Sequence, residues 1–267
     1  MFLYICPAIV FNIIFLMKGI YSVLGIVYMI TTSFYGSPEK AVMRNETNTK
    51  RIEKSVEMNS VKAEKTMSSS EELYHSITFE QGHELNPDVF FKAMTGFENL
   101  KKAGLLNPDS HLLTVCDFSM SSNTKRLWVI DMNEKKVLFN SLVAHGKNTG
   151  EEFATNFSNT ESSLQSSLGF YITDATYQGD NGYSLKLLGM DKGFNDAAYR
   201  RAIVMHGADY VSDQFAATHK RIGRSWGCPA VPRELTQPII NTIKGRNLLF
   251  IYYPDQNYLS KSEWLKA

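Results

Sequence analysis

The distribution of apolar residues divides the chain into three stretches. Residues 2–30 are almost wholly apolar, with Lys18 as the only charge. Residues 37–72 are polar and carry no repeat or helical stripe, whereas apolar positions recur with regular spacing from Leu73 onward. A polar stretch of this kind cannot bury enough surface to offset the entropy lost on ordering. The pattern predicts an N-terminal apolar segment (1–36), a flexible linker (37–82) and a folded domain (83–267).

The periodicity of the folded part predicts strands with a few helices. Between Pro87 and Gly104, large apolar residues recur at intervals of three or four, which indicates an amphipathic helix. A second short helix is expected over 232–244, ending at Gly245. Runs rich in β-branched and aromatic residues predict strands over 112–118, 126–132, 137–143, 169–173, 183–188, 201–205 and 247–253. The expected fold class is therefore mainly β, and mostly antiparallel.

Composition narrows the class of protein. The chain has 267 residues, 43% of them hydrophobic, and a formal net charge of +1. A nucleic-acid-binding domain is normally strongly basic, so none is expected here. The three cysteines are Cys6, Cys116 and Cys228, with no CxxC pair and no zinc-ligand spacing, so no metal site is expected. Cys116 lies in a predicted strand and is expected to be a buried thiol. A Cys116–Cys228 disulfide is not favoured, because it would consume the Cys228 thiol, the candidate nucleophile.

The apolar N-terminus has the layout of a secretory signal peptide. Met17 and Lys18 precede an apolar run (19–30) and a small polar region (31–33). This layout predicts translation from Met17 and export to the periplasm or cell envelope. The alternative is a retained anchor that tethers the protein to the membrane, since about 20 apolar residues can span one.

Cys228 is the candidate nucleophile. It lies between Gly227 and Pro229, a sequence that presents a side chain on a tight turn. A cysteine is strongly nucleophilic only as its thiolate, and a nearby imidazole commonly generates it. The predicted strand 201–205 delivers His206 at its end, so His206 is expected to take the thiol proton or to hold a thiolate–imidazolium pair. Backbone amides near Gly227 and Cys228 are expected to stabilise an oxyanion.

Other residues compete for roles in this site. His219 lies in a polar segment expected to be a solvated loop, and His145, at a strand end, is a candidate for the wall of a substrate cleft. Arg221 and Arg224 are surface cations by default, but either is also suited to hold a substrate carboxylate. Trp226 either walls the cleft or packs against the body.

At these residues the chain resembles the YkuD-like cysteine enzymes, the L,D-transpeptidases of peptidoglycan. Their motif is a histidine, a spacer and then Ser/Thr-His-Gly-Cys. Here an eighteen-residue spacer separates His206 from Ser225, Trp226 replaces the second histidine, and Ala230 stands where Asn or Arg is usual. Both departures are typical of a divergent branch, the murein L,D-transpeptidase catalytic-domain family. The resemblance covers roughly residues 85–254.

The resemblance implies a YkuD-like β-sandwich or barrel fold and no cofactor. It implies Cys228 as nucleophile, His206 as base, the Gly207 backbone carbonyl as the group that orients the histidine, and the Gly227 amide near the oxyanion. Residues implied near the substrate are His145, Ser158, Asn159, Ser167, Arg224, Ser225 and Trp226.

The implied activity is acyl transfer between peptidoglycan peptide stems. Cys228 would attack a tetrapeptide stem at the bond between an L-centre and a D-residue, and an amine of a second stem would accept the acyl group. Three alternatives remain open: an L,D-carboxypeptidase that uses water as acceptor, a non-catalytic wall-binding protein, and an exported cysteine protease. The last usually needs a side chain to orient its histidine, and none is evident.

Overall fold

The computed structural model describes residues 69–266. The expected signal peptide, 1–36, and most of the expected linker lie outside the described residues. Within residues 69–266, no helix is long and apolar enough to cross a membrane.

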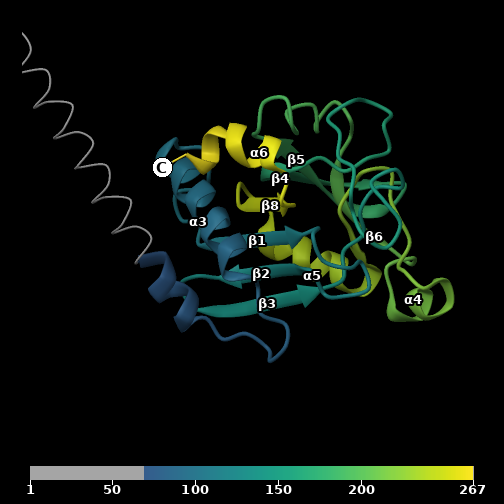
Figure 1. Cartoon of the computed structure of the whole chain (residues 1–267), viewed down its shortest axis with the longest axis horizontal. Helices are drawn as coiled ribbons and strands as arrows, with labels where there is room; N and C mark the ends of the chain where they lie inside the picture. Colours follow the sequence, from purple (N-terminus) through teal and green to yellow (C-terminus); the bar gives the residue numbers. More distant parts are fainter. Residues whose placement is uncertain (1–68, 267) are drawn as a thin grey trace, which may run out of the picture. The chain divides into compact units, whose positions relative to one another are not determined.

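A single β-sheet with helices around it forms the described domain (Figure 1). The strands are β1 (Leu112–Asp117), β2 (Leu127–Asp131), β3 (Lys136–Ser141), β4 (Gly169–Gly179), β5 (Gly182–Gly189), β6 (Val204–Ala208), β7 (Ala230–Pro232) and β8 (Leu248–Tyr252). The helices are α3 (Pro87–Lys102), α4 (Asp213–His219), α5 (Arg233–Ile243) and α6 (Gln256–Lys261), followed by a 3₁₀ turn (Glu263–Leu265).

The strands form one curved sheet that nearly closes on itself. Their order is β3-β2-β1-β8-β4-β5-β6-β7, and neighbours are antiparallel except for the parallel pairs β1·β8 and β6·β7. Beyond the end of β3, the Ala144 amide donates to the Ala230 carbonyl of β7 at 2.8 Å, which brings the two edges of the sheet together. The predicted mainly β, barrel-like fold is confirmed.

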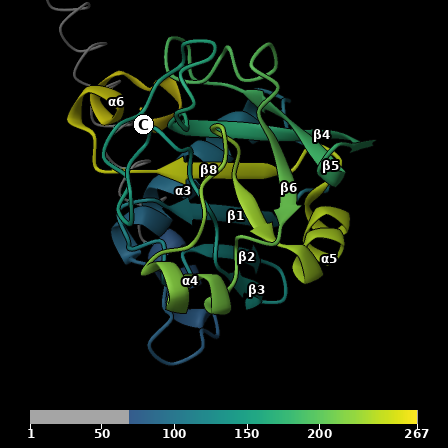
Figure 2. The same ribbon diagram turned by 90° about the vertical axis from the view of Figure 1, so that its right-hand side faces the viewer.

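The core lies inside this sheet and is covered by two helices. Strands β1, β2 and β8 are buried along their whole length. Helix α3 packs against β1 and β8, and α5 packs against β5, β6 and β7 (Figure 2). Continuous apolar strands of this kind are expected where both faces are covered.

Helix α3 forms where the apolar spacing predicts it. The Asn86 side chain accepts hydrogen bonds from the amides of Asp88 at 2.9 Å and Val89 at 3.4 Å, which caps the first turn. At Gly96 a Cβ atom would lie 2.2 Å from the Phe170 ring, so the missing side chain allows the helix to approach the sheet closely. This contact ties the helix to β4.

Several details differ from the expectations. Strand β4 continues beyond residue 173 to Gly179, and the short strand β7 was not predicted. Strand β6 begins at Val204 and not at residue 201, because Ala202 has a left-handed backbone (φ 52°) that interrupts the extended run. His206 therefore lies inside the strand and not at its end. His219 lies in the last turn of α4 and not in a loop; this helix has no buried residue, so it leaves no apolar stripe to detect.

Part of the segment expected to be linker packs against the domain. Ile77 is buried, and the Tyr74 ring lies 5.3 Å from the Phe90 ring. The Tyr74 hydroxyl donates to the Leu85 carbonyl at 2.7 Å. The packed body therefore begins before residue 83.

Candidate active site

Cys228 and His206 lie near each other because β6 and β7 run side by side. His206 is paired with Ala230 in the parallel register, so Cys228, two residues earlier, lies level with Val204. The Val204 amide donates to the Cys228 sulfur at 3.5 Å. Cys228 and His206 line the same open cleft, which has a volume of about 720 Å³.

His206 is held as a neutral imidazole. Only 4% of the residue is exposed, and Nδ1 lies 3.1 Å from the Gly207 carbonyl oxygen. This contact places the proton on Nδ1 and leaves Nε2 as the acceptor nitrogen. Burial is the main cause that lowers the pKa of His206; the Gly207 carbonyl opposes it and Arg233 adds to it.

The Cys228 thiol is also held in its neutral form. Burial raises its pKa, while the Val204 amide and the Arg201 guanidinium pull the pKa down. In the described part of the chain the sulfur's hydrogen-bond partners are backbone groups, the Val204 amide and the Ala202 carbonyl at 3.7 Å. Of the two arrangements left open by the sequence, these pKa directions favour proton transfer to His206 during attack over a resting thiolate–imidazolium pair.

The turn that presents Cys228 is braced by Ser225. The buried Ser225 hydroxyl donates to the Cys228 carbonyl at 2.6 Å and accepts from the Gly227 amide at 3.0 Å. Gly227 has φ 125°, and a Cβ there would lie 2.7 Å from the Gln165 carbonyl oxygen. The expected oxyanion donor, the Gly227 amide, is thus already paired with Ser225. The Cys228 amide, which donates to no group within residues 69–266, is the available donor at this turn.

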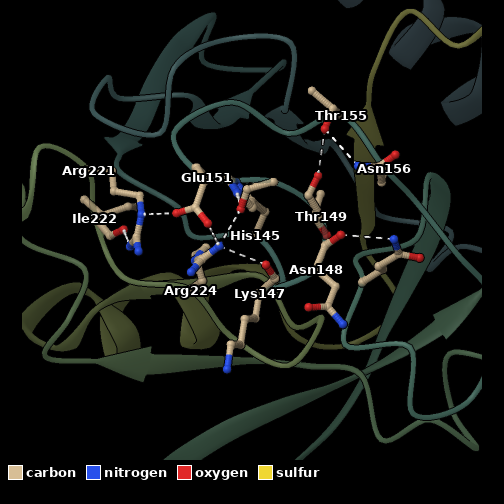
Figure 3. A network of polar contacts seen from close by, with 12 residues as sticks. His145, Lys147, Asn148, Thr149, Glu151, Thr155, Asn156, Arg221, Ile222 and Arg224 are labelled. Atoms are coloured by element: carbon tan, nitrogen blue, oxygen red, sulfur yellow. Dashed lines mark hydrogen bonds and ion pairs between the residues drawn. The ribbon is translucent and has the colours of Figure 1, made fainter.

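A second loop is pinned to this turn by arginines (Figure 3). Arg224 Nη1 donates to the Lys147 and Gly150 carbonyls, both at 3.0 Å, and to Glu151 Oε1 at 2.8 Å. Arg221 Nε donates to the other oxygen of the same carboxylate at 2.8 Å. Arg224 also lines the cleft, with its charge paired to Glu151 and its Nη1 bonded to the protein. The default interpretation of Arg221 and Arg224 as unattached surface cations is not what the structure shows.

His145 contacts the turn at Ser225 from the protein interior and does not line the cleft. It is 1% exposed, and its Nδ1 lies 2.7 Å from Nη2 of the fully buried Arg126. Burial, followed by the charge of Arg126, lowers the pKa of His145 to about 3. Its carbonyl accepts from the Ser225 amide at 3.0 Å. The structure therefore places His145 as a brace and not at the substrate position expected for it.

Three further expected substrate residues also hold loops together. Ser167 donates to the Ser158 carbonyl at 2.8 Å, and the Asn159 side chain donates to Asp196 at 2.7 Å. Arg201 donates to the Ser158 carbonyl at 2.8 Å and also contacts the Ser167 hydroxyl. None of the three is among the residues that line the cleft. Polar side chains that satisfy buried backbone groups look the same in sequence as polar side chains that bind substrate.

The cleft contains residues that the sequence analysis did not single out for the site. Ser225 and Trp226 line it as expected, and Trp226 is 77% exposed. The additional lining includes Tyr177, Asn181, Arg201 and Tyr210. These residues come from the β4–β5 hairpin and from the segments flanking β6, and only the sheet topology brings them to Cys228. Within residues 69–266, no group of three or more His, Cys, Asp or Glu side chains is placed to hold a metal ion.

A nearly closed sheet with a cysteine and a histidine on one cleft wall has the parts that cysteine acyl transfer requires. The chain matches the L,D-transpeptidase catalytic domain family over residues 81–252, and it belongs to that family. No curated protein matches the chain.

Several solved structures are similar to the chain at low identity. A mutant of the helical cell shape determining protein Pgp2 from Campylobacter jejuni is 14% identical, with 62% of this chain and 57% of that chain covered and a TM-score of 0.36. The L,D-transpeptidase LdtMt1 in complex with imipenem is 12% identical, with 53% and 59% covered and a TM-score of 0.32. An L,D-transpeptidase from Mycobacterium smegmatis is 11% identical, with 54% and 59% covered and a TM-score of 0.33. The match thus spans less than two thirds of each of these chains.

Proposed function

We propose that this protein is an exported peptidoglycan L,D-transpeptidase that forms a thioester between Cys228 and a tetrapeptide stem. The observation that carries the proposal is the shared cleft, which Cys228 and His206 both line while the Gly207 carbonyl holds Nδ1 of His206. Membership of the L,D-transpeptidase catalytic domain family supports the reaction class.

The first half-reaction transfers the acyl group to sulfur. His206 Nε2 takes the thiol proton as the sulfur attacks the carbonyl carbon between an L-centre and a D-residue. The Cys228 amide stabilises the oxyanion; one such donor contributes about 2.7–4 kcal/mol in other hydrolases. The C–N bond then breaks, and His206 returns the proton to the departing amine.

The second half-reaction reverses these steps with a new amine. The amine of a second stem attacks the thioester carbon, and His206 takes a proton from the attacking nitrogen. The C–S bond breaks, and the proton passes to the sulfur, so the thiol is restored and a new amide is formed. With water in place of the amine, the same steps make an L,D-carboxypeptidase.

Export forms part of the proposal. The apolar segment before residue 37 has the layout of a signal peptide, with a membrane tether as the alternative. N-terminal sequencing of the mature protein tests this prediction; a mature N-terminus at or before Leu16 would rule out translation from Met17.

The activity is tested by product analysis. The purified protein is incubated with tetrapeptide muropeptides, with and without a second stem as amine acceptor, and the products are resolved by mass spectrometry. We expect cross-linked dimers that disappear in Cys228→Ala and persist in the matched variant Cys116→Ala, whose thiol is buried away from the cleft. Tripeptide alone, even with acceptor present, would favour the carboxypeptidase. No turnover by the wild type would favour a non-catalytic wall-binding protein.

A further inference from the structure

A second cavity adjoins the catalytic cleft across the start of β6. It has a volume of about 370 Å³. Tyr177, Ala202, Ile203 and Val204 line both cavities, whereas Lys186 and Tyr199 line only the second. A ligand group in the second cavity would therefore be a direct neighbour of a group bound at Cys228.

The sheet register fixes the distance between Lys186 and the nucleophile. Lys186 of β5 is paired with Val204 of β6, and Val204 donates to the Cys228 sulfur on its other side. Directly paired residues project on one face, and adjacent strands are about 4.8 Å apart. Two such spacings put Lys186 about 10 Å from Cys228 along the wall of the sheet.

The Lys186 ammonium is held between two tyrosine rings. Its Nζ lies 5.8 Å from the centre of the Tyr177 ring and 5.6 Å from that of Tyr199. The rings are 38% and 55% exposed. Among residues 69–266 no carboxylate forms an ion pair with Lys186, so its charge faces the cavity without a counterion.

The two arginines of the cleft are, by contrast, bonded to the protein through their Nη atoms, and Arg201 Nε is buried without a partner in the described residues. Arg201 donates to the Ser158 and Gln165 carbonyls and also contacts serine hydroxyls. Arg224 donates to two carbonyls and to Glu151. The Lys186 ammonium, in comparison, has neither an ion pair nor a hydrogen-bond partner among residues 69–266, so it is available to a ligand anion.

We propose that Lys186, with Tyr177 and Tyr199, forms a carboxylate subsite for the amine partner of the reaction. This inference rests on the proposed function. The departing D-residue and the attacking D-centre of a diamino acid share one chemistry, since each carries a carboxylate on the carbon next to the reacting nitrogen. One residue spans about 3.5 Å, so a carboxylate one residue beyond the thioester carbon fits in the interval between Cys228 and Lys186. The same subsite serves both half-reactions because the two amines occupy one place in turn.

The test compares two acceptors that differ only in the carboxylate. The acyl-enzyme is formed with a tetrapeptide, and its transfer to D-alanine and to D-alaninamide is followed by mass spectrometry in the wild type and in Lys186→Met. The intrinsic reactivities of the two amines cancel when the preference for D-alanine is compared between proteins. Loss of a charge-assisted hydrogen bond predicts that the preference for D-alanine over D-alaninamide is about tenfold smaller in Lys186→Met. We expect the change to arise in KM for D-alanine, and we expect Lys186→Arg to restore part of the preference.

The matched control is Lys192→Met, at an exposed lysine that lines neither cavity; we expect it to keep the wild-type preference. An unchanged preference in Lys186→Met, with the acyl-enzyme still formed, overturns the subsite. Absence of an acyl-enzyme on wild-type Cys228 would instead contradict the proposed function, so the two failures are distinguishable.

Discussion

Replacing Ser225 with alanine removes the group that holds the turn on which Cys228 lies. Its hydroxyl both donates to the Cys228 carbonyl at 2.6 Å and accepts from the Gly227 amide at 3.0 Å. Ser225 is 4% exposed, so water cannot readily replace the hydroxyl. The substitution leaves a buried amide and a carbonyl without their partner.

The structure sets the size of the effect. A buried polar group that loses its partner costs about 1–3 kcal/mol. A carbonyl keeps a second lone pair for other donors, so its share lies at the lower end. Together we expect Ser225→Ala to lower the free energy of unfolding by about 2–4 kcal/mol. The turn also loses its fixed path, so the rate of Cys228 acylation should fall about tenfold or more, since a misplaced nucleophile loses near-attack geometry.

Two assays measure these effects. Urea denaturation gives the free energy of unfolding, and the rate of acyl-enzyme formation at native conditions gives the chemical effect. The matched control is Ser260→Ala, whose exposed hydroxyl bonds only backbone carbonyls of its own helix, α6; its stability should change by less than about 0.5 kcal/mol. If Ser225→Ala behaved like this control in both assays, the Ser225 hydroxyl would not be the group that holds the turn.

Three other predictions follow from the same geometry. Gly227→Ala should lower the free energy of unfolding by about 2–4 kcal/mol, because it adds a clash with a backbone oxygen to a strained φ; Gly82→Ala, which has φ 79° and nothing within 4 Å, should show only the strain of about 1 kcal/mol in the same urea titration. The acylation rate should fall only at pH values below 6.5, because neutral His206 is the base and burial lowers its pKa; a pH–rate profile with an acid limb at or above 6.5 contradicts this. The free energy of unfolding should fall by up to about 4 kcal/mol between pH 6.5 and 3, because His145 is protonated in the unfolded state but stays neutral in the folded state, where its pKa is about 3. Urea titrations of His145→Gln should show a flatter decline over this pH range.

The sequence predicted the elements with long apolar faces. Helices α3 and α5 and most strands have such faces, so the regular spacing of their apolar residues predicted them. The predicted start of β6 was wrong, because nothing in the sequence indicates that Ala202 has a left-handed backbone. Helix α4 was missed because its seven residues bury nothing.

The site was predicted unevenly for a physical reason. Cys228 and His206 stood out as candidates because their residue types and surrounding glycines are unusual together, and the structure places both on one cleft. His145 and Asn159 could not be told apart from substrate contacts, because burial is a property of the fold and not of the residue type. The sequence did not predict Lys186 as a residue near Cys228, since that position depends on the register of β5 and β6.

The central claim is that Cys228 is acylated with His206 as its base. Incubation of the protein with a tetrapeptide stem, followed by peptide mapping of the trapped adduct, tests it most directly. We predict a tripeptide acyl group on Cys228, none on Cys116, and a rate of adduct formation reduced by about 10²–10⁴ in His206→Gln. An adduct on another residue, or one that forms on Cys228 at an unchanged rate in His206→Gln, would contradict the claim.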